Sequence, residues 1–195
     1  MIIYFFISLI IIIFCHEFAH LIVAKKCGCG VDIFSVGFGK PIYRKEYKGT
    51  IYQFTPILLG GYCKLRDELT ISTDKESFSN LVYHKKVLIA LAGVTVNMIM
   101  GAIFFLVGEF LHNYILAYFG YLSFLLGITN AIPFPALDGS YPILVWLEKF
   151  MGKEKGYQMM SLICRFGFIF LIILQIACIP LLIKFVKLGS LTWLK

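Results

Sequence analysis

Residues 1–24 read MIIYFFISLIIIIFCHEFAHLIVA, and the basic pair Lys25 and Lys26 follows them. About 20 apolar residues in a helix cross the core of a bilayer, so this run predicts a transmembrane helix. The run nevertheless contains the ionisable segment His16-Glu17-Phe18-Ala19-His20. At a rise of 1.5 Å per residue, His16 lies roughly 13 Å from Lys25, inside the hydrocarbon region. Three ionisable side chains at that depth are costly unless they are paired or bind a ligand.

The composition of the whole chain agrees with a membrane location. Hydrophobic residues make up 59% of the 195 residues and charged residues only 15%, whereas about 25% charged residues are usual in soluble domains. Three further apolar runs are long enough to span a bilayer, at about 87–111, 115–132 and 162–185. We therefore expect an α-helical integral membrane protein with about four transmembrane helices, which form a single membrane-embedded domain over residues 1–195.

Segment 31–66 has a different pattern. Gly and Pro residues interrupt Ile, Phe, Tyr and Thr there, which predicts short strands broken by turns. We expect a small membrane-associated β-hairpin or sheet between the first and second transmembrane helices. Residues 50–59 are apolar enough to enter the bilayer, where a bare strand edge would leave backbone groups unpaired. This piece should therefore fold back on itself or lie against the helices.

The basic residues indicate an orientation in the membrane. Segment 25–86 holds 11 of the 18 Lys and Arg residues, and segment 139–161 holds three more. Positively charged loops mark the cytoplasmic face, so both segments should be cytoplasmic, although Lys184, Lys187 and Lys195 then lie outside. The intramembrane histidines would be nearer the cytoplasmic face. The basic cluster does not indicate nucleic-acid binding, because no base-reading motif accompanies it.

The spacing of His16 and His20 indicates a metal site. A helix places residues four apart on one face, so both imidazoles can share one metal ion. Glu17 is then the expected catalytic base, which takes a proton from the activated water and passes it to the leaving amine. A polar patch that packs against other helices is the alternative interpretation of the same three residues.

A catalytic zinc site usually has three protein ligands, and the best third candidate is Asp138. It follows a long apolar run and comes after Pro133 and Pro135, which prevent a regular helix. Irregular backbone at membrane depth is tolerated where it is buried in protein or lines a watery cavity. The alternative is that Asp138 caps a helix that begins near Tyr141 and Pro142.

Several motifs together resemble the site-2 protease family of intramembrane zinc metalloproteases. Besides His16-Glu17-Phe18-Ala19-His20, they are FSVGFG at 34–39, LGGYCK at 59–64, AGVTVN at 92–97 and NAIPFPALDG at 130–139. The chain looks like a compact bacterial-type member without a PDZ or CBS domain, since only a few residues separate the second and third helices. It departs from many relatives at Ser140-Tyr141, where they have Gly-His.

The resemblance implies an activity and a set of site residues. It implies one catalytic zinc ion, location in the bacterial cytoplasmic membrane, and regulated intramembrane proteolysis of a single-span membrane protein substrate. Asn97 and Asn130 would bind or polarise the substrate backbone, although hydrogen bonds between packed helices explain each of them equally well. Gly93 would allow two helices to approach closely. The strand near 50–59 could pair with a locally unwound substrate by β-augmentation.

Two other functions fit part of the pattern. The first is a non-proteolytic zinc-binding membrane protein, either an inactive homologue or a transporter. An inactive homologue would be expected to lack Glu17, and a transporter would be expected to carry polar residues along several spans. The second is an integral-membrane protease whose third ligand is a downstream glutamate. Glu109 and Glu148 are available for that role, but no recognisable motif surrounds either of them.

Overall fold

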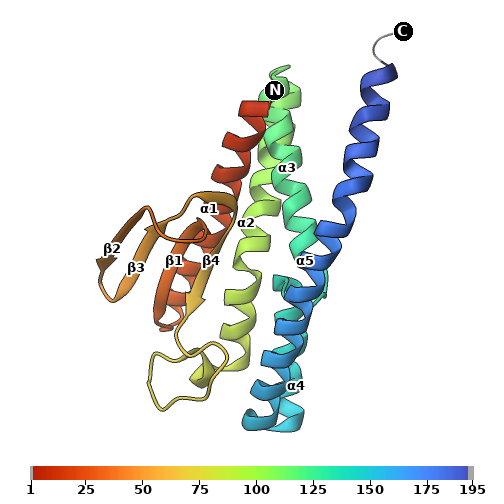
Figure 1. The fold of residues 1–195 in the computed structure, drawn as a ribbon. Coiled ribbons are helices and arrows are strands. Elements are labelled where there is room, and N and C mark those ends of the chain that lie inside the picture. The colour runs from red at the N-terminus through yellow and green to blue at the C-terminus, as the bar shows by residue number, and fades with distance from the viewer. Residues whose placement is uncertain (1, 193–195) are drawn as a thin grey trace.

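The computed structural model describes residues 2–192, in which it places five α-helices and a four-stranded sheet (Figure 1). The helices are α1 (Ile2–Lys26), α2 (Tyr83–Phe110), α3 (Tyr114–Ala131), α4 (Tyr141–Met151) and α5 (Lys153–Thr192). Two short 3-10 turns are η1 (Phe78–Asn80) and η2 (Asp138–Ser140). The predicted fold class, helices with a small sheet between the first and second spans, is confirmed.

Within the described residues, four helices are long and apolar enough to cross a membrane, namely Ile3–Lys26, Tyr83–Phe110, Tyr114–Ala131 and Lys153–Ile173. The first three agree closely with the predicted runs. The fourth begins at Lys153 rather than near residue 162, because the charged segment before the apolar run is also helical. The predicted loop 139–161 therefore contains α4 and the first turns of α5. Hydropathy detects the apolar part of a helix, not its full length.

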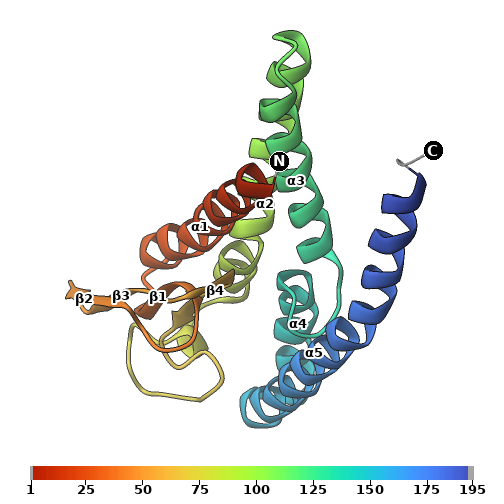
Figure 2. The same cartoon turned by 45° about the horizontal axis from the view of Figure 1, so that its top comes forward.

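The second and third spans form a helical hairpin. The link between α2 and α3 is only residues 111–113, which leaves no room for an inserted domain there. Asn113 begins α3, because its side chain accepts a hydrogen bond of 3.1 Å from the backbone N–H of Leu116. The two helices then run side by side along most of their length (Figures 1 and 2).

The sheet has the strand order β2-β3-β1-β4. Its strands are β1 (Val31–Phe38), β2 (Tyr43–Tyr47), β3 (Thr50–Phe54) and β4 (Ile57–Leu65). β1 and β3 are parallel, and the other two pairs are antiparallel. The predicted single strand over 50–59 is thus divided at Thr55 and Pro56 between β3 and β4. Because β3 is paired on both sides, it has no free edge, whereas no described strand pairs with the outer edge of β4.

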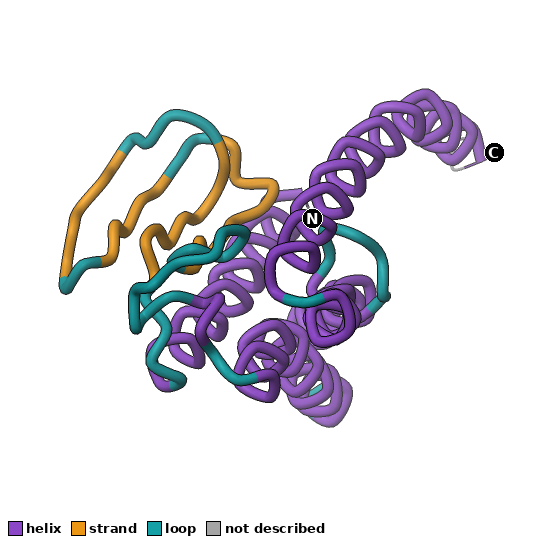
Figure 3. The backbone as a smooth tube through the Cα atoms, turned by 90° about the horizontal axis from the view of Figure 1, so that it is seen from below, coloured by secondary structure: helices purple, strands orange, loops and turns teal. Residues whose placement is uncertain are grey.

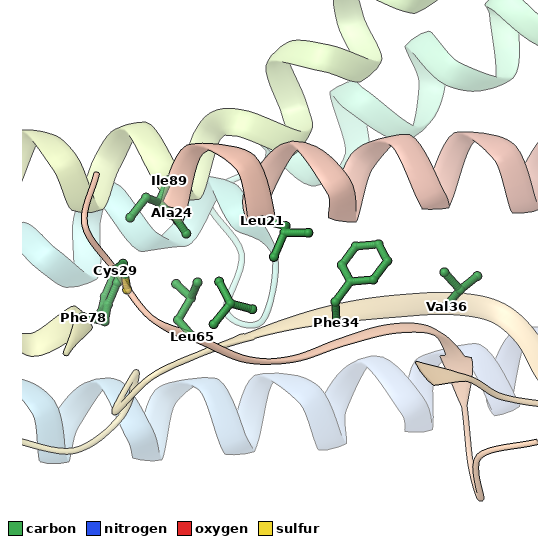
Figure 4. Close-up of a cluster of buried hydrophobic side chains, with 9 residues drawn as sticks. Leu21, Ala24, Cys29, Phe34, Val36, Leu65, Phe78 and Ile89 are labelled. Atoms are coloured by element: carbon green, nitrogen blue, oxygen red, sulfur yellow. The ribbon is translucent and has the colours of Figure 1, made fainter. Parts of the chain in front are cut away.

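One face of the sheet packs against α1 (Figures 1 and 3). Phe34 of β1 lies against Phe14 and Phe18, with ring centroids 5.8 and 6.2 Å apart. A buried cluster continues from these rings toward the basic end of α1 (Figure 4), and its members are Leu21, Ala24, Cys29, Val31, Phe34, Val36, Leu65, Phe78 and Ile89. This cluster fixes β1 and β4 against the helix that carries the histidines.

A buried ion pair joins α2 to α4 and α5. Lys86 is only 2% exposed, and its Nζ donates to both carboxylate oxygens of Glu148, at 3.0 and 2.7 Å. The same ammonium donates to the hydroxyl of Tyr157 at 3.0 Å. Buried charges are retained where they are paired and hydrogen-bonded in this way. This contact holds α4 against the N-terminal end of α2. Because η2 directly precedes α4, it is held there too.

Candidate metal centre

Three predicted ligands converge between α1 and η2. His16 and His20 are buried, and their Nε2 atoms lie 3.3 Å apart. Oδ2 of Asp138 lies 2.9 Å from Nε2 of His16 and 3.3 Å from Nε2 of His20. The structure therefore brings together, across more than a hundred residues of sequence, the three side chains that the sequence indicated as one group.

The hydrogen bonds behind His20 show what this group requires. Its Nδ1 lies 2.7 Å from the carbonyl oxygen of Ile89, and because a carbonyl only accepts, Nδ1 must carry the proton. In neutral His20 the lone pair on Nε2 then faces the carboxylate oxygen of Asp138, which has no hydrogen-bond donor among the described residues. Two acceptors in contact need a proton or a metal cation between them.

The separations fit a tetrahedral metal ion. Zinc–ligand bonds of roughly 2.0–2.2 Å place ligand atoms roughly 3.3–3.6 Å apart. The observed distances of 2.9–3.3 Å are slightly shorter and would open by a small side-chain movement. Two imidazoles and one carboxylate are also ligand types that zinc takes in proteins. The residues present therefore fit a zinc ion.

Gly93 lets α2 pack directly against the two histidines. A Cβ atom there would lie 2.5 Å from Nε2 of His20 and 2.6 Å from Nε2 of His16. Any side chain at this position would collide with the two ring nitrogens that face Asp138. The predicted close approach of two helices at Gly93 is confirmed, and this approach is directly beside the candidate ligands.

A proline-broken segment delivers Asp138 to this place. α3 ends at Ala131, and after Pro133 and Pro135 the chain turns back, with Ala136 at a positive φ of 75°. The next helix, α4, has Ser140 as its N-cap residue, and no side-chain hydrogen bond caps it. The alternative in which Asp138 caps this helix is therefore wrong, because its carboxylate faces the histidines instead.

Glu17 lies beside the three candidate ligands and faces β4. Both Glu17 and residues 60–65 of β4 line one cavity of about 770 Å³, which also contains the candidate ligands. Gly61 allows the strand to lie this close, because a Cβ there would be 2.9 Å from Cγ of Glu17. The carboxylate of Glu17 is thus held near the metal position without being one of the converging ligands.

The two predicted substrate-binding asparagines have different locations. Asn130 lines the cavity, and its Nδ2 donates to the carbonyl of Leu126 at 3.2 Å. Asn97 is 0% exposed, and its Nδ2 lies 3.0 Å from Nδ1 of His16. A substrate in the cavity could reach Asn130 but not a fully buried side chain behind His16. The predicted substrate contact of Asn97 does not fit this location.

Sequence reasoning missed two residues of the cavity wall. The hydroxyl of Tyr141 donates a hydrogen bond to Oε1 of Glu68, and both side chains line the cavity. Burial raises the pKa of the Glu68 carboxyl group, and the hydrogen bond from Tyr141 opposes that shift. Glu68 lies in a polar loop without a motif. Only the Tyr in place of His at position 141 could have drawn attention to this pair.

Most of the other residues that line the cavity are apolar. Its wall includes side chains from α1, β4, α3 and α5, among them Leu9, Ile13, Ile57, Leu126, Phe168, Leu171 and Ile172. Because α1, α3 and α5 are transmembrane candidates, the His-His-Asp group lies in a largely apolar cavity between helices long enough to cross a membrane. Figure 2 shows α1 and the sheet on one side of the α2–α3 hairpin and α5 on the other.

The fold and this site define an integral membrane protein with a His-His-Asp group suited to zinc. Residues 4–115 and 109–174 match the sequence profile of peptidase family M50, and the chain belongs to this family. The solved structure "Site-2 Protease from Methanocaldococcus jannaschii" has the same fold, with a TM-score of 0.56 and 22% identity. The match covers 96% of this chain and 73% of that one.

Curated bacterial relatives match about half of the chain. The "Putative zinc metalloprotease" of Borreliella burgdorferi is 39% identical over 109 residues, which are 51% of this chain and 25% of that protein. "Regulator of sigma-E protease RseP" of Escherichia coli is 39% identical over 100 residues, 49% of this chain and 22% of that protein. The matched region is thus about a quarter of the length of these relatives. The family and the first name imply zinc, for which the His-His-Asp group is suited.

Proposed function

We propose that this chain is an intramembrane zinc metalloprotease that hydrolyses peptide bonds of membrane-spanning proteins. The observation that carries the proposal is the convergence of His16, His20 and Asp138 beside Glu17, in a cavity walled by transmembrane helices. We propose His16, His20 and Asp138 as the ligands of one catalytic zinc ion and Glu17 as the base. The substrate would be a single-span protein of the bacterial cytoplasmic membrane, cut nearer the cytoplasmic face.

The chemistry follows from the positions of these side chains. When bound, the zinc ion supplies a water molecule whose pKa is lowered to about 7. Glu17 would accept a proton from the attacking water as the water oxygen bonds to the carbonyl carbon of the substrate. Glu17 then passes the proton to the leaving amide nitrogen as the C–N bond breaks. The products are a new carboxyl terminus and a new amino terminus within the former membrane span.

The apolar wall suits a substrate segment taken from lipid. A helical substrate hides its carbonyl groups in hydrogen bonds, so it must unwind before Glu17 and the zinc ion can act on it. Unwound backbone in an apolar chamber needs new hydrogen-bond partners. Asn130 lines the chamber and can offer its amide to such a segment, so we retain it as a proposed substrate contact.

We propose that β4, rather than β3, pairs with the unwound substrate. β4 is an edge strand that lines the cavity, and β-augmentation requires a free edge of this kind. Its N–H groups point alternately toward β1 and away from it. Proline can replace either Cys63 or Lys64. Whichever substitution removes an N–H that points toward β1 should destabilise the sheet. The variant that removes an outward N–H should stay folded and lower kcat/KM for cleavage.

The expected loss for the folded proline variant is roughly 2- to 12-fold, the equivalent of one backbone hydrogen bond at roughly 0.5–1.5 kcal/mol. Cys63→Ala and Lys64→Ala are the matched controls, because they remove the same side chains and keep the N–H groups. Thermal unfolding separates the two proline variants before activity is compared. Wild-type cleavage by both proline variants, each fully folded, would exclude pairing through this part of β4.

Removal of zinc tests the proposed function as a whole. The purified protein in detergent or vesicles should cleave at least some members of a panel of single-span proteins. We expect a chelator that strips the metal to abolish this cleavage and stoichiometric zinc, but not magnesium, to restore it. Elemental analysis of the same samples measures occupancy. Cleavage that persists after all zinc has been removed would refute the proposal.

A further inference from the structure

Asn97 is a polar side chain that the catalytic scheme above does not use. It lies within α2, is 0% exposed, and directs its amide at His16 of α1. Polar side chains inside membrane spans are expensive and tend to have a specific partner. We propose that Asn97 is a positioning residue that fixes the tautomer and ring orientation of His16 for zinc. This inference rests on the proposed function.

The direction of the His16 ring determines which nitrogen can bind metal. Nε2 faces both Asp138 and His20, at 2.9 and 3.3 Å, so a metal ion held by this group needs the lone pair on Nε2. A neutral imidazole then carries its proton on Nδ1, and that proton needs an acceptor. The amide of Asn97 is the hydrogen-bond partner at Nδ1. Its carbonyl oxygen is the group that can accept.

The hydrogen bonds of the amide agree with this assignment. When Nδ2 faces His16, Oδ1 is buried and has no donor among the described residues. The two orientations of a carboxamide have nearly the same shape, so the hydrogen-bond network decides between them. With the amide turned over, Oδ1 accepts from Nδ1–H of His16, so the tautomer that metal binding requires selects this orientation of the amide.

His20 has the same arrangement with a backbone group. Its Nδ1–H donates to the carbonyl of Ile89, which also belongs to α2. α2 therefore holds both rings from behind. It holds His20 through the main-chain oxygen of Ile89 and His16 through the side-chain oxygen of Asn97. Such partners fix the tautomer of metal-binding histidines and increase their basicity. The parallel supports a role for Asn97 behind the metal rather than in the substrate path.

The third span holds Asn97 in place. The hydroxyl of Ser123 in α3 donates to the backbone carbonyl of Asn97 at 3.0 Å. Ser123 is also 0% exposed, and its hydroxyl bonds to the backbone of Asn97 rather than to the amide group. The two residues are therefore a natural pair for an experiment, because both are buried polar contacts at the same point of the bundle. Only one of them reaches His16.

The test measures zinc affinity rather than activity, by competition with a chelator for Asn97→Ala, Asn97→Asp and Ser123→Ala in detergent. Changes behind a metal ligand typically weaken binding about 10- to 100-fold, and we expect that loss for Asn97→Ala. Ser123→Ala should bind zinc like the wild type. Asn97→Asp should stay within a few-fold of the wild type, because a carboxylate can accept from Nδ1–H. Thermal unfolding of the zinc-free proteins monitors folding.

Wild-type zinc affinity in folded Asn97→Ala would overturn the inference, and so would an equal loss in Asn97→Ala and Ser123→Ala. If Asn97→Ala does not fold, Asn97→Asp decides alone. A carboxylate cannot donate, so folded Asn97→Asp that binds zinc tightly supports the inference, and one that loses zinc overturns it. A wild-type protein that binds no zinc would instead refute the proposed function on which the inference depends.

Discussion

Glu17→Gln is expected to lower kcat/KM for peptide cleavage by roughly 10²- to 10⁴-fold, the usual contribution of a general acid–base group. Glutamine has nearly the same shape as glutamate but cannot accept a proton from water. Because Glu17 lies beside the converging ligands and is not one of them, zinc content should remain near that of the wild type. Cleavage of a single-span substrate and elemental analysis of the same preparation measure the two effects.

Glu109→Gln is the matched control for this variant. It makes the same chemical change at an exposed position near the end of α2, outside the cavity, and should cleave like the wild type. Full activity of Glu17→Gln at full zinc occupancy would show that Glu17 is not the base. The non-proteolytic alternative predicts that neither the wild type nor either variant cleaves any substrate.

Asp138→Ala is expected to lose zinc. It removes one of three converging ligands, whereas catalytic zinc sites usually keep three protein ligands. The loss of affinity should therefore exceed the roughly 10- to 100-fold effect of changes behind a ligand. Cleavage should be lost together with the metal. The dissociation constant from chelator competition, measured beside that of Asn97→Ala, separates a ligand from a positioning residue.

Asp138→Asn and Glu154→Ala complete this experiment. Asparagine keeps the shape of the side chain and removes its charge, so it should also bind zinc weakly. Glu154 is exposed in the first turn of α5 and should tolerate alanine without any change in zinc affinity. Zinc binding by folded Asp138→Ala with the wild-type constant would mean that another group completes the site.

Much of the fold could be predicted because the membrane is a strong constraint. Long apolar runs need helices that satisfy their own backbone hydrogen bonds, so composition alone indicated four spans. Glycine and proline within 31–66 similarly indicated strands. The start of α5 could not be predicted from hydropathy, since its first turns are charged. Strand order could not be predicted either, because neither strand's own sequence says which strands pair with it.

Part of the candidate site could likewise be predicted from the sequence, and part could not. The sequence determined His16, Glu17 and His20 as a group by itself, because residues one and four apart on a helix have fixed relative positions. It also indicated Asp138 as their partner, through a motif on a segment that prolines keep from being helical. Contacts between distant segments have no such local rule. Only the tertiary structure decided that Asn97 lies behind His16, that Tyr141 meets Glu68, and that β4 has a free edge beside the cavity.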